Sequence, residues 1–170
     1  MEQITLFLDM DGVLTNFEKA YREMWHEFTF DRERFREAVM QREIFKNLEW
    51  MPNGEMFIEG VRKLEKDYNL NVEMLTSTGT HRTDMKAAGI EQKTHWLKEH
   101  GIVWKPNFVS SKPEKSQHAR SHTILIDDHV GCTGPFIEKG GIAFLHKDSD
   151  YRLTLDKLDW CLDELTREVV

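Results

Sequence analysis

The stretch that decides the fold is Ile-Thr-Leu-Phe-Leu-Asp-Met-Asp-Gly-Val-Leu-Thr, residues 4–15. Its first five residues are almost all apolar, which predicts a strand buried on both faces of a parallel sheet. Asp9 and Asp11 follow at once, so two carboxylates stand two residues apart where this strand ends. Such carboxylates repel each other and lose hydration when buried, and a divalent cation offsets both costs. Hard oxygen ligands of this kind favour Mg²⁺.

Along the rest of the chain, short β-rich runs alternate with helical patterns. Four further strands are predicted at residues 72–75, 108–109, 123–126 and 142–145. Apolar residues recur at helical spacing from Phe57 to Tyr68 and from Leu158 to Val169. Strand followed by helix, repeated, predicts an α/β fold with a doubly wound parallel sheet and right-handed crossovers.

One segment, residues 15–52, does not follow this alternation. It has no strand pattern and two helical patterns, the second of which is expected to begin at Asp31 as N-cap. The first helical pattern places six apolar or aromatic residues on one face: Phe17, Ala20, Tyr21, Met24, Trp25 and Phe28. We therefore divide the chain into an α/β core, residues 1–14 and 53–170, and a small helical cap, residues 15–52. Because the cap follows the first strand, it is expected to cover the ligand crevice of the sheet. Packing on the flank is the alternative.

A second acidic pair, Asp127 and Asp128, follows the apolar run 124–126. If the strands are parallel, both acidic pairs lie at one edge of the sheet, where they would repel each other strongly without a metal. Hydroxyl groups follow the strand 72–75, at a position where backbone N–H groups ahead of a helix can bind an anion. Lysines at 112 and 115 precede the strand 123–126 and supply positive charge near the same edge.

Composition limits the classes of partner. The 170 residues suffice for one domain, and their formal net charge of −7 disfavours duplex DNA and anionic membranes as partners. No apolar run is long enough to span a bilayer. Two cysteines and a start without a basic region predict reduced thiols and a cytoplasmic location. The eight histidines lack the spacing of a zinc site. A small-molecule substrate is the partner that these features favour.

Together these motifs resemble the haloacid dehalogenase superfamily. Its phosphatases carry hhhDxDGxhT, hhhT/S, a lysine and hhhDD in this order (h is an apolar residue). The corresponding positions here are residues 6–15, 72–76, Lys115 and residues 124–128. Residues 9–14 with Phe17, and the run from Lys115 to Leu145, are further similar to the 5′(3′)-deoxyribonucleotidase branch. The resemblance implies a Rossmann-like core of that superfamily and a Mg²⁺-dependent hydrolase of phosphoric monoesters.

The resemblance also implies roles for the acidic residues. Asp9 would be the nucleophile and would form an aspartyl-phosphate. Asp11 would be the general acid for the leaving oxygen and then the base for water. Mg²⁺ would be held by the Asp9 carboxylate, the backbone carbonyl of Asp11, and one residue of the second pair. Asp128 is favoured as that ligand, with Asp127 orienting it, but the choice between the two is open.

Substrate contacts are implied in the same way. Thr76, Ser77 and Lys115 would bind the phosphoryl oxygens, and Lys115 matches the family spacing better than Lys112. Phe17 and Phe45 would contact the base, although Phe17 serves equally well, with Tyr21, Trp25 and Phe28, as part of the core face of a cap helix. The chain departs from the branch at Met40, where a tryptophan is expected, and at Thr78, where proline is common. These departures leave the preferred base open.

The function that these arguments favour is a 5′(3′)-deoxyribonucleotidase-like phosphomonoesterase acting on nucleoside monophosphates. The alternative is a phosphatase for another small phosphate, such as a sugar phosphate. A receiver-like signalling module is disfavoured, since receivers carry the adjacent acidic pair after the first strand. A dehalogenase is disfavoured because that reaction does not need Asp11. The oligomeric state is open, with a homodimer as one alternative.

Overall fold

A computed structural model describes residues 2–27 and 29–167 of the protein, so Phe28 and Val169 of the predicted helical patterns lie outside the described residues. The chain forms a five-stranded parallel sheet in the order β3-β2-β1-β4-β5. The strands are β1 (Thr5–Leu8), β2 (Asn71–Ser77), β3 (Lys105–Val109), β4 (Thr123–Asp127) and β5 (Ile142–Leu145). The predicted α/β fold with a doubly wound parallel sheet is therefore confirmed.

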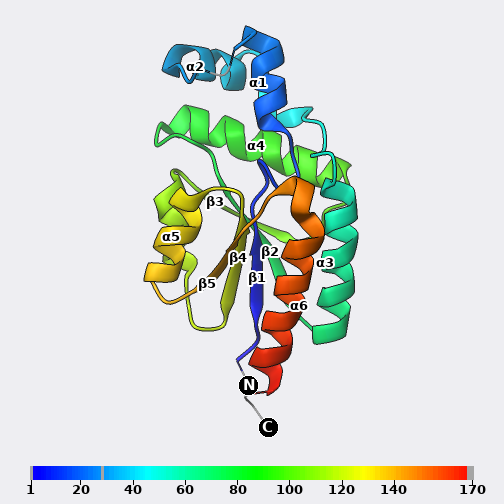
Figure 1. Ribbon diagram of the computed structural model, residues 1–170. Helices are drawn as coiled ribbons and strands as arrows, with labels where there is room; N and C mark the ends of the chain where they lie inside the picture. The colour runs from blue at the N-terminus through cyan, green and yellow to red at the C-terminus, as the bar shows by residue number, and fades with distance from the viewer. Residues whose placement is uncertain (1, 28, 168–170) are drawn as a thin grey trace.

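Helices connect the strands on both faces of the sheet. The α-helices are α1 (Phe17–Trp25), α2 (Arg32–Met40), α3 (Gly54–Tyr68), α4 (Thr83–Glu99), α5 (Val130–Glu138) and α6 (Tyr151–Arg167). Three short 3₁₀ helices are η1 (Ile44–Lys46), η2 (Lys112–His118) and η3 (Asp148–Asp150). Figure 1 shows α3 and α6 together on one side of the sheet and α5 on the other. Among the described residues, no helix has the length and apolar character needed to cross a membrane.

The central strand β1 is buried on both faces because its side chains alternate between two cores. Leu6 and Leu8 join the larger core, which includes Phe57 of α3. Phe7 points to the opposite face and packs in the smaller core with Phe136 of α5, their ring centroids 6.5 Å apart. This period of two explains why three consecutive residues of β1, 6–8, are apolar and do not alternate with polar ones.

The strand order reverses between β1 and β4, and this places the ligand crevice. Leu8 of β1 is in register with Met74 of β2 and with Ile126 of β4. The carboxyl ends of these three strands therefore lie side by side at one edge of the sheet. In doubly wound folds, ligands bind outside this edge at the point of reversal. Asp9, Ser77 and Asp127 all lie there.

The segment 15–52, called the insertion from here on, lies beyond this edge and not on the flank (Figure 1). Its helix α2 begins as predicted, because the Asp31 side chain accepts a hydrogen bond from the backbone N–H of Arg34 at 2.9 Å. Two buried side chains of α4 bind its backbone. Gln92 Nε2 donates to the carbonyl of Val39, and Trp96 Nε1 donates to that of Leu48, each at 2.8 Å. The insertion is thus attached to the core through α4.

Candidate active site

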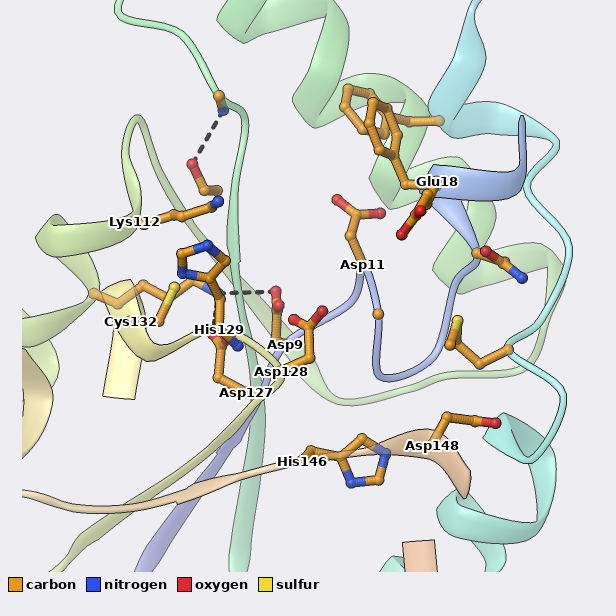
Figure 2. Close-up of a pocket in the computed structure, with 18 of the residues that line it drawn as sticks. Asp9, Asp11, Glu18, Lys112, Asp127, Asp128, His129, Cys132, His146 and Asp148 are labelled. Atoms are coloured by element: carbon orange, nitrogen blue, oxygen red, sulfur yellow. Dashed lines mark hydrogen bonds and ion pairs between the residues drawn. The ribbon is translucent and has the colours of Figure 1, made fainter. Parts of the chain in front are cut away.

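A cavity of about 720 Å³ lies between the carboxyl edge of the sheet and the insertion (Figure 2). Its acidic wall is formed by Asp9, Asp11, Asp127 and Asp128. Its aromatic wall comes from the insertion and consists of Phe17, Phe30, Phe35 and Phe45. Both acidic pairs predicted from the sequence therefore face one cavity, and an apolar surface lies opposite them.

Lys115 connects the two acidic pairs. Its ammonium nitrogen lies 2.8 Å from Asp9 Oδ1 and 2.7 Å from Asp127 Oδ2. The lysine is 1% exposed and Asp127 is fully buried, so neither charge has water to solvate it. Buried charges are tolerated when they are paired in this way. Lys112, the other candidate lysine, is exposed at the cavity rim.

Negative charge is concentrated at Asp9. Burial raises the pKa of Asp9 well above its usual value, and Asp127 adds to the rise while Lys115 opposes it. The same two causes, desolvation first and Asp127 second, raise the pKa of Asp128 to about 6. Ionisation of Asp9 and Asp128 is therefore costly without a further cation, because Lys115 is the lysine shared by Asp9 and Asp127.

The donor set fits a divalent cation. One carboxylate oxygen from each of Asp9, Asp127 and Asp128 lies within 4.8 Å of the other two. Both oxygens of Asp127 already accept hydrogen bonds, Oδ2 from Lys115 and Oδ1 from the backbone N–H of His129 at 3.0 Å. Asp128 is the more exposed residue of that pair. Three carboxylate oxygens at this spacing are a ligand set suited to Mg²⁺.

Gly12 allows the two acidic loops to approach each other. Its φ is +86°, a conformation that L side chains rarely adopt, and a Cβ atom here would lie 2.0 Å from Asp128 Oδ2. Any side chain at this position would push Asp128 away from Asp9. The glycine that follows Asp11 is thus required by both backbone conformation and space.

The carboxylate of Asp11 is held separately from the other three. Its Oδ1 accepts a hydrogen bond from Thr15 Oγ1 at 2.8 Å, and its Oδ2 lies 2.7 Å from Lys93 Nζ. In Figure 2, Asp9 and Asp128 point toward one another, whereas the Asp11 carboxylate lies on the side of Glu18, a residue of the insertion. Asp11 therefore lies between the insertion and the group of Asp9, Asp127 and Asp128, which is called the acidic cluster from here on.

Lys93 is a further site residue, and it was not among the catalytic, substrate-binding or metal-binding residues predicted from the sequence. It lies on α4 and is completely buried. The available signal was its spacing, because Lys93 follows Gly89 by four residues and precedes Leu97 by four, and all three are buried on one face of the helix. A lysine on the buried face of a helix requires an acidic or polar partner.

The two hydroxyl residues at the end of β2 differ in their surroundings. Ser77 lines the cavity and accepts a hydrogen bond from the N–H of Gly79 at 3.1 Å. Thr76 is fully buried, and its Oγ1 accepts a hydrogen bond from Lys93 Nζ at 2.8 Å. Phosphate binding by Thr76 or Ser77 stays a prediction. In the structure, the hydroxyl group of Thr76 is already hydrogen-bonded to Lys93 of α4.

The two aromatic residues expected to contact a base pack against each other. The rings of Phe17 and Phe45 are stacked, with centroids 5.5 Å apart and planes at 24°. Phe45 is buried and Phe17 is half-buried. A base therefore has no slot between these two rings, although Phe17 lines the cavity.

No protein-family model matches the chain, and no curated protein sequence is similar to it. Solved structures are similar in fold. A haloacid dehalogenase-like family hydrolase from Xanthomonas campestris aligns with a TM-score of 0.58 over 96% of this chain and 94% of its own, at 12% identity. A dehalogenase described with an intermediate complex aligns with a TM-score of 0.51 over 83% of each chain, also at 12% identity. The chain therefore has the fold of the haloacid dehalogenase-like hydrolases.

Proposed function

We propose that the protein is a Mg²⁺-dependent phosphomonoesterase that transfers the phosphoryl group of a nucleoside monophosphate to Asp9 and then to water. The observation that carries this proposal is the placement of Asp9. It lies 2.8 Å from the buried ammonium of Lys115 and within 4.8 Å of a carboxylate oxygen of both Asp127 and Asp128. A carboxylate beside one fixed cation and one cation-binding cluster suits attack on a phosphate dianion, which needs its charge compensated.

The geometry supports the carboxylate ligands of the metal, and the resemblance adds a backbone one. The carboxylates of Asp9 and Asp128 would hold Mg²⁺ together with the backbone carbonyl of Asp11, which only the resemblance implies. Asp127, whose oxygens are both hydrogen-bonded, would orient the group. When bound, Mg²⁺ supplies charge compensation for the phosphoryl oxygens. Lys115 supplies the second positive charge from within the protein.

The chain's own residues then account for both steps. In the first, a carboxylate oxygen of Asp9 bonds to phosphorus as the bond to the leaving oxygen breaks, and the Asp11 carboxyl gives its proton to that oxygen. In the second, Asp11 accepts a proton from water as the water oxygen attacks phosphorus. The bond to Asp9 breaks and inorganic phosphate leaves. Thr15 and Lys93 hold Asp11 through both steps.

The nucleoside assignment is supported by the aromatic wall. With the phosphate at Asp9, the organic part of the substrate extends toward the insertion, where Phe17 and Phe30 face the cavity. Stacking on an aromatic ring contributes about 1–3 kcal/mol per base and tolerates different bases. A sugar phosphate would leave this apolar surface without a partner.

A dehalogenase is the second candidate, because one of the similar structures is described as a dehalogenase. A halide leaves without a proton, so that reaction gives no task to an acid in the place of Asp11. The cluster of Asp9, Asp127 and Asp128 likewise has no use there without a cation. The acidic content of the site therefore favours phosphate ester hydrolysis.

The test measures phosphate release from 5′- and 3′-(deoxy)nucleoside monophosphates and sugar phosphates, and halide release from a 2-haloacid, with Mg²⁺ and with chelator. Wild type is compared with Asp9→Asn and with Glu18→Gln, a substitution of a cavity carboxylate outside the acidic cluster. We expect Mg²⁺-dependent release from nucleotides that Asp9→Asn lowers by at least about 10³-fold. Release from sugar phosphates alone would overturn the nucleotide assignment, and halide release alone would overturn the phosphatase.

A further inference from the structure

Lys93 is the second fully buried lysine of the site, and each of its contacts involves a segment of the cavity wall. Its ammonium nitrogen lies 2.7 Å from Asp11 Oδ2 and 2.8 Å from Thr76 Oγ1. It also lies 4.5 Å from the ring centroid of Phe45. A buried ammonium group loses its hydration, so a lysine is retained at such a place only with partners of this kind.

The two lysines bind three of the four carboxylates of the acidic wall. Lys115 binds Asp9 and Asp127, whereas Lys93 binds Asp11. The Asp11 side chain is 28% exposed, so solvent alone would not fix its direction. Thr15 and Lys93, which approach different oxygens of this carboxylate, determine one orientation. Thr15 belongs to the same loop as Asp11, but Lys93 lies 82 residues away on α4.

Helix α4 is itself fixed with respect to the insertion. Gln92, next to Lys93, accepts a hydrogen bond from the N–H of Phe45 at 3.3 Å and donates to Val39. Trp96 donates a hydrogen bond from its Nε1 to the backbone carbonyl of Leu48. The helix that carries Lys93 is thus bound to the wall on which the organic part of the substrate would lie, and to β2 through Thr76.

We propose that Lys93 is a positioning residue that holds Asp11 at the leaving oxygen of the substrate and, after transfer, at the attacking water. This inference rests on the proposed phosphomonoesterase activity. Lys93 acts through Asp11, so its contribution follows the need for proton transfer. General acid catalysis contributes about 10²–10⁴-fold where the leaving group requires a proton, and little where it does not.

The experiment uses two aryl phosphates of similar size, phenyl phosphate and 4-nitrophenyl phosphate. Only phenolate requires a proton as it leaves. With enzyme in excess and Mg²⁺ present, we measure one turnover of Asp9 phosphorylation in wild type, Lys93→Met and Asp11→Asn. We expect Lys93→Met to slow the reaction of phenyl phosphate by about 10²-fold and that of 4-nitrophenyl phosphate less than fivefold. In multiple turnovers, 4-nitrophenyl phosphate should show a burst, because hydrolysis at Asp9 still needs the base.

Two comparisons separate positioning from stability. Gln92→Met alters the neighbouring buried residue of α4 and its bonds to the insertion, so it should affect both phosphates equally. The double variant, Lys93→Met combined with Asp11→Asn, should be no slower than Asp11→Asn alone. Both changes remove the same contribution, proton transfer by Asp11, so their effects should not add. Equal slowing of both phosphates by Lys93→Met, or an additive double variant, would show that Lys93 only stabilises the fold.

A second variant covers the case in which Lys93→Met does not fold. Lys93→Gln keeps a polar head group near Thr76 without the charge, and the same ratio of the two phosphates applies to it. Failure of the proposed phosphomonoesterase function would give other results than failure of the Lys93 inference. In that case wild type hydrolyses neither phosphate, or the effect of Asp11→Asn does not depend on the leaving group. An active wild type with such a dependence for Asp11→Asn, but not for the Lys93 variants, contradicts this inference alone.

Discussion

The ammonium nitrogen of Lys115 lies 2.8 Å from Asp9 Oδ1 at the base of the cavity, and both side chains are almost wholly enclosed by protein. Lys115 comes from η2, which precedes β4, and Asp9 follows β1. The pair therefore joins the two strands between which the sheet order reverses. It brings a positive charge to the carboxylate that would otherwise face Asp127 and Asp128 unopposed.

Removal of this charge should destabilise the fold. Lys115→Met leaves Asp9 and Asp127 buried without their common partner, and the loss of one member of a buried ion pair costs about 3–5 kcal/mol. Urea denaturation measures the free energy of unfolding. Lys112→Met is the matched control, because Lys112 is exposed and should change stability by less than about 0.5 kcal/mol. Similar losses in the two variants would contradict a structural role for the Lys115 pairs.

Divalent cations should stabilise the protein through the acidic cluster. At a hundredfold excess over its Kd, a ligand that binds only the folded state adds about 2.7 kcal/mol. Thermal unfolding with increasing Mg²⁺, and again with chelator, measures this gain. Asp128→Asn should remove most of it, because Asp128 belongs to the cluster. Glu18→Gln should retain it, and equal Mg²⁺ responses of the two variants would place the cation elsewhere.

Truncation of Phe17 should weaken binding of nucleotides selectively. Phe17→Ala removes the ring that lines the cavity and stacks on Phe45. The loss of one base-stacking contact should raise the KM for nucleoside monophosphates about tenfold, equivalent to about 1.4 kcal/mol. Ribose 5-phosphate, which has no base, serves as the control substrate. An equal rise of KM for both would show that Phe17 only supports the core.

Acid should destabilise the fold through His146. This residue is 3% exposed, and burial lowers the pKa of its imidazole below the usual value of 6.5. The unfolded chain therefore binds a proton at a higher pH than the folded chain does. Stability present above pH 6.5 is lost as the pH falls toward the lower folded pKa, with a slope of up to about 1.4 kcal/mol per pH unit.

Urea denaturation between pH 7.5 and 5.5 tests this contribution. His146→Gln should show a flatter decline than wild type, since it removes the group that titrates. His95→Gln is the control because it replaces an exposed imidazole on α4. The difference between variant and wild type isolates His146 from Asp9, whose raised pKa acts in the opposite direction. Parallel profiles of His146→Gln and wild type would refute the assignment.

Much of the sheet follows from local pattern. A parallel strand covered on both faces must be apolar throughout, so β1 and β4 are visible as short apolar runs, and each has its acidic pair at its end. The hydrogen bond that begins α2 at Asp31 joins residues three positions apart and is equally visible. The length of β3 was underestimated, because Lys105, Pro106 and Asn107 carry no apolar signal.

Contacts between distant segments were not visible in this way. The stacking of Phe17 on Phe45 depends on how α1 and η1 pack within the insertion, and a helical pattern cannot distinguish a ring that faces a ligand from one that faces another ring. Lys115 and Lys112 lie on the same 3₁₀ helix, and only the packing of this helix against α5, β2 and β3 makes one buried and leaves the other exposed.

The sequence by itself determined the parallel sheet, the edge at which the carboxylates gather and the position of Asp9 and Asp11 at the end of a strand, because each depends on apolar runs and on the residues that directly follow them. Only the tertiary structure decided which lysine serves which carboxylate. Lys93 reaches Asp11 across 82 residues because α4 packs between β2 and the insertion, and the cost of burying its ammonium group is offset only in that packed arrangement.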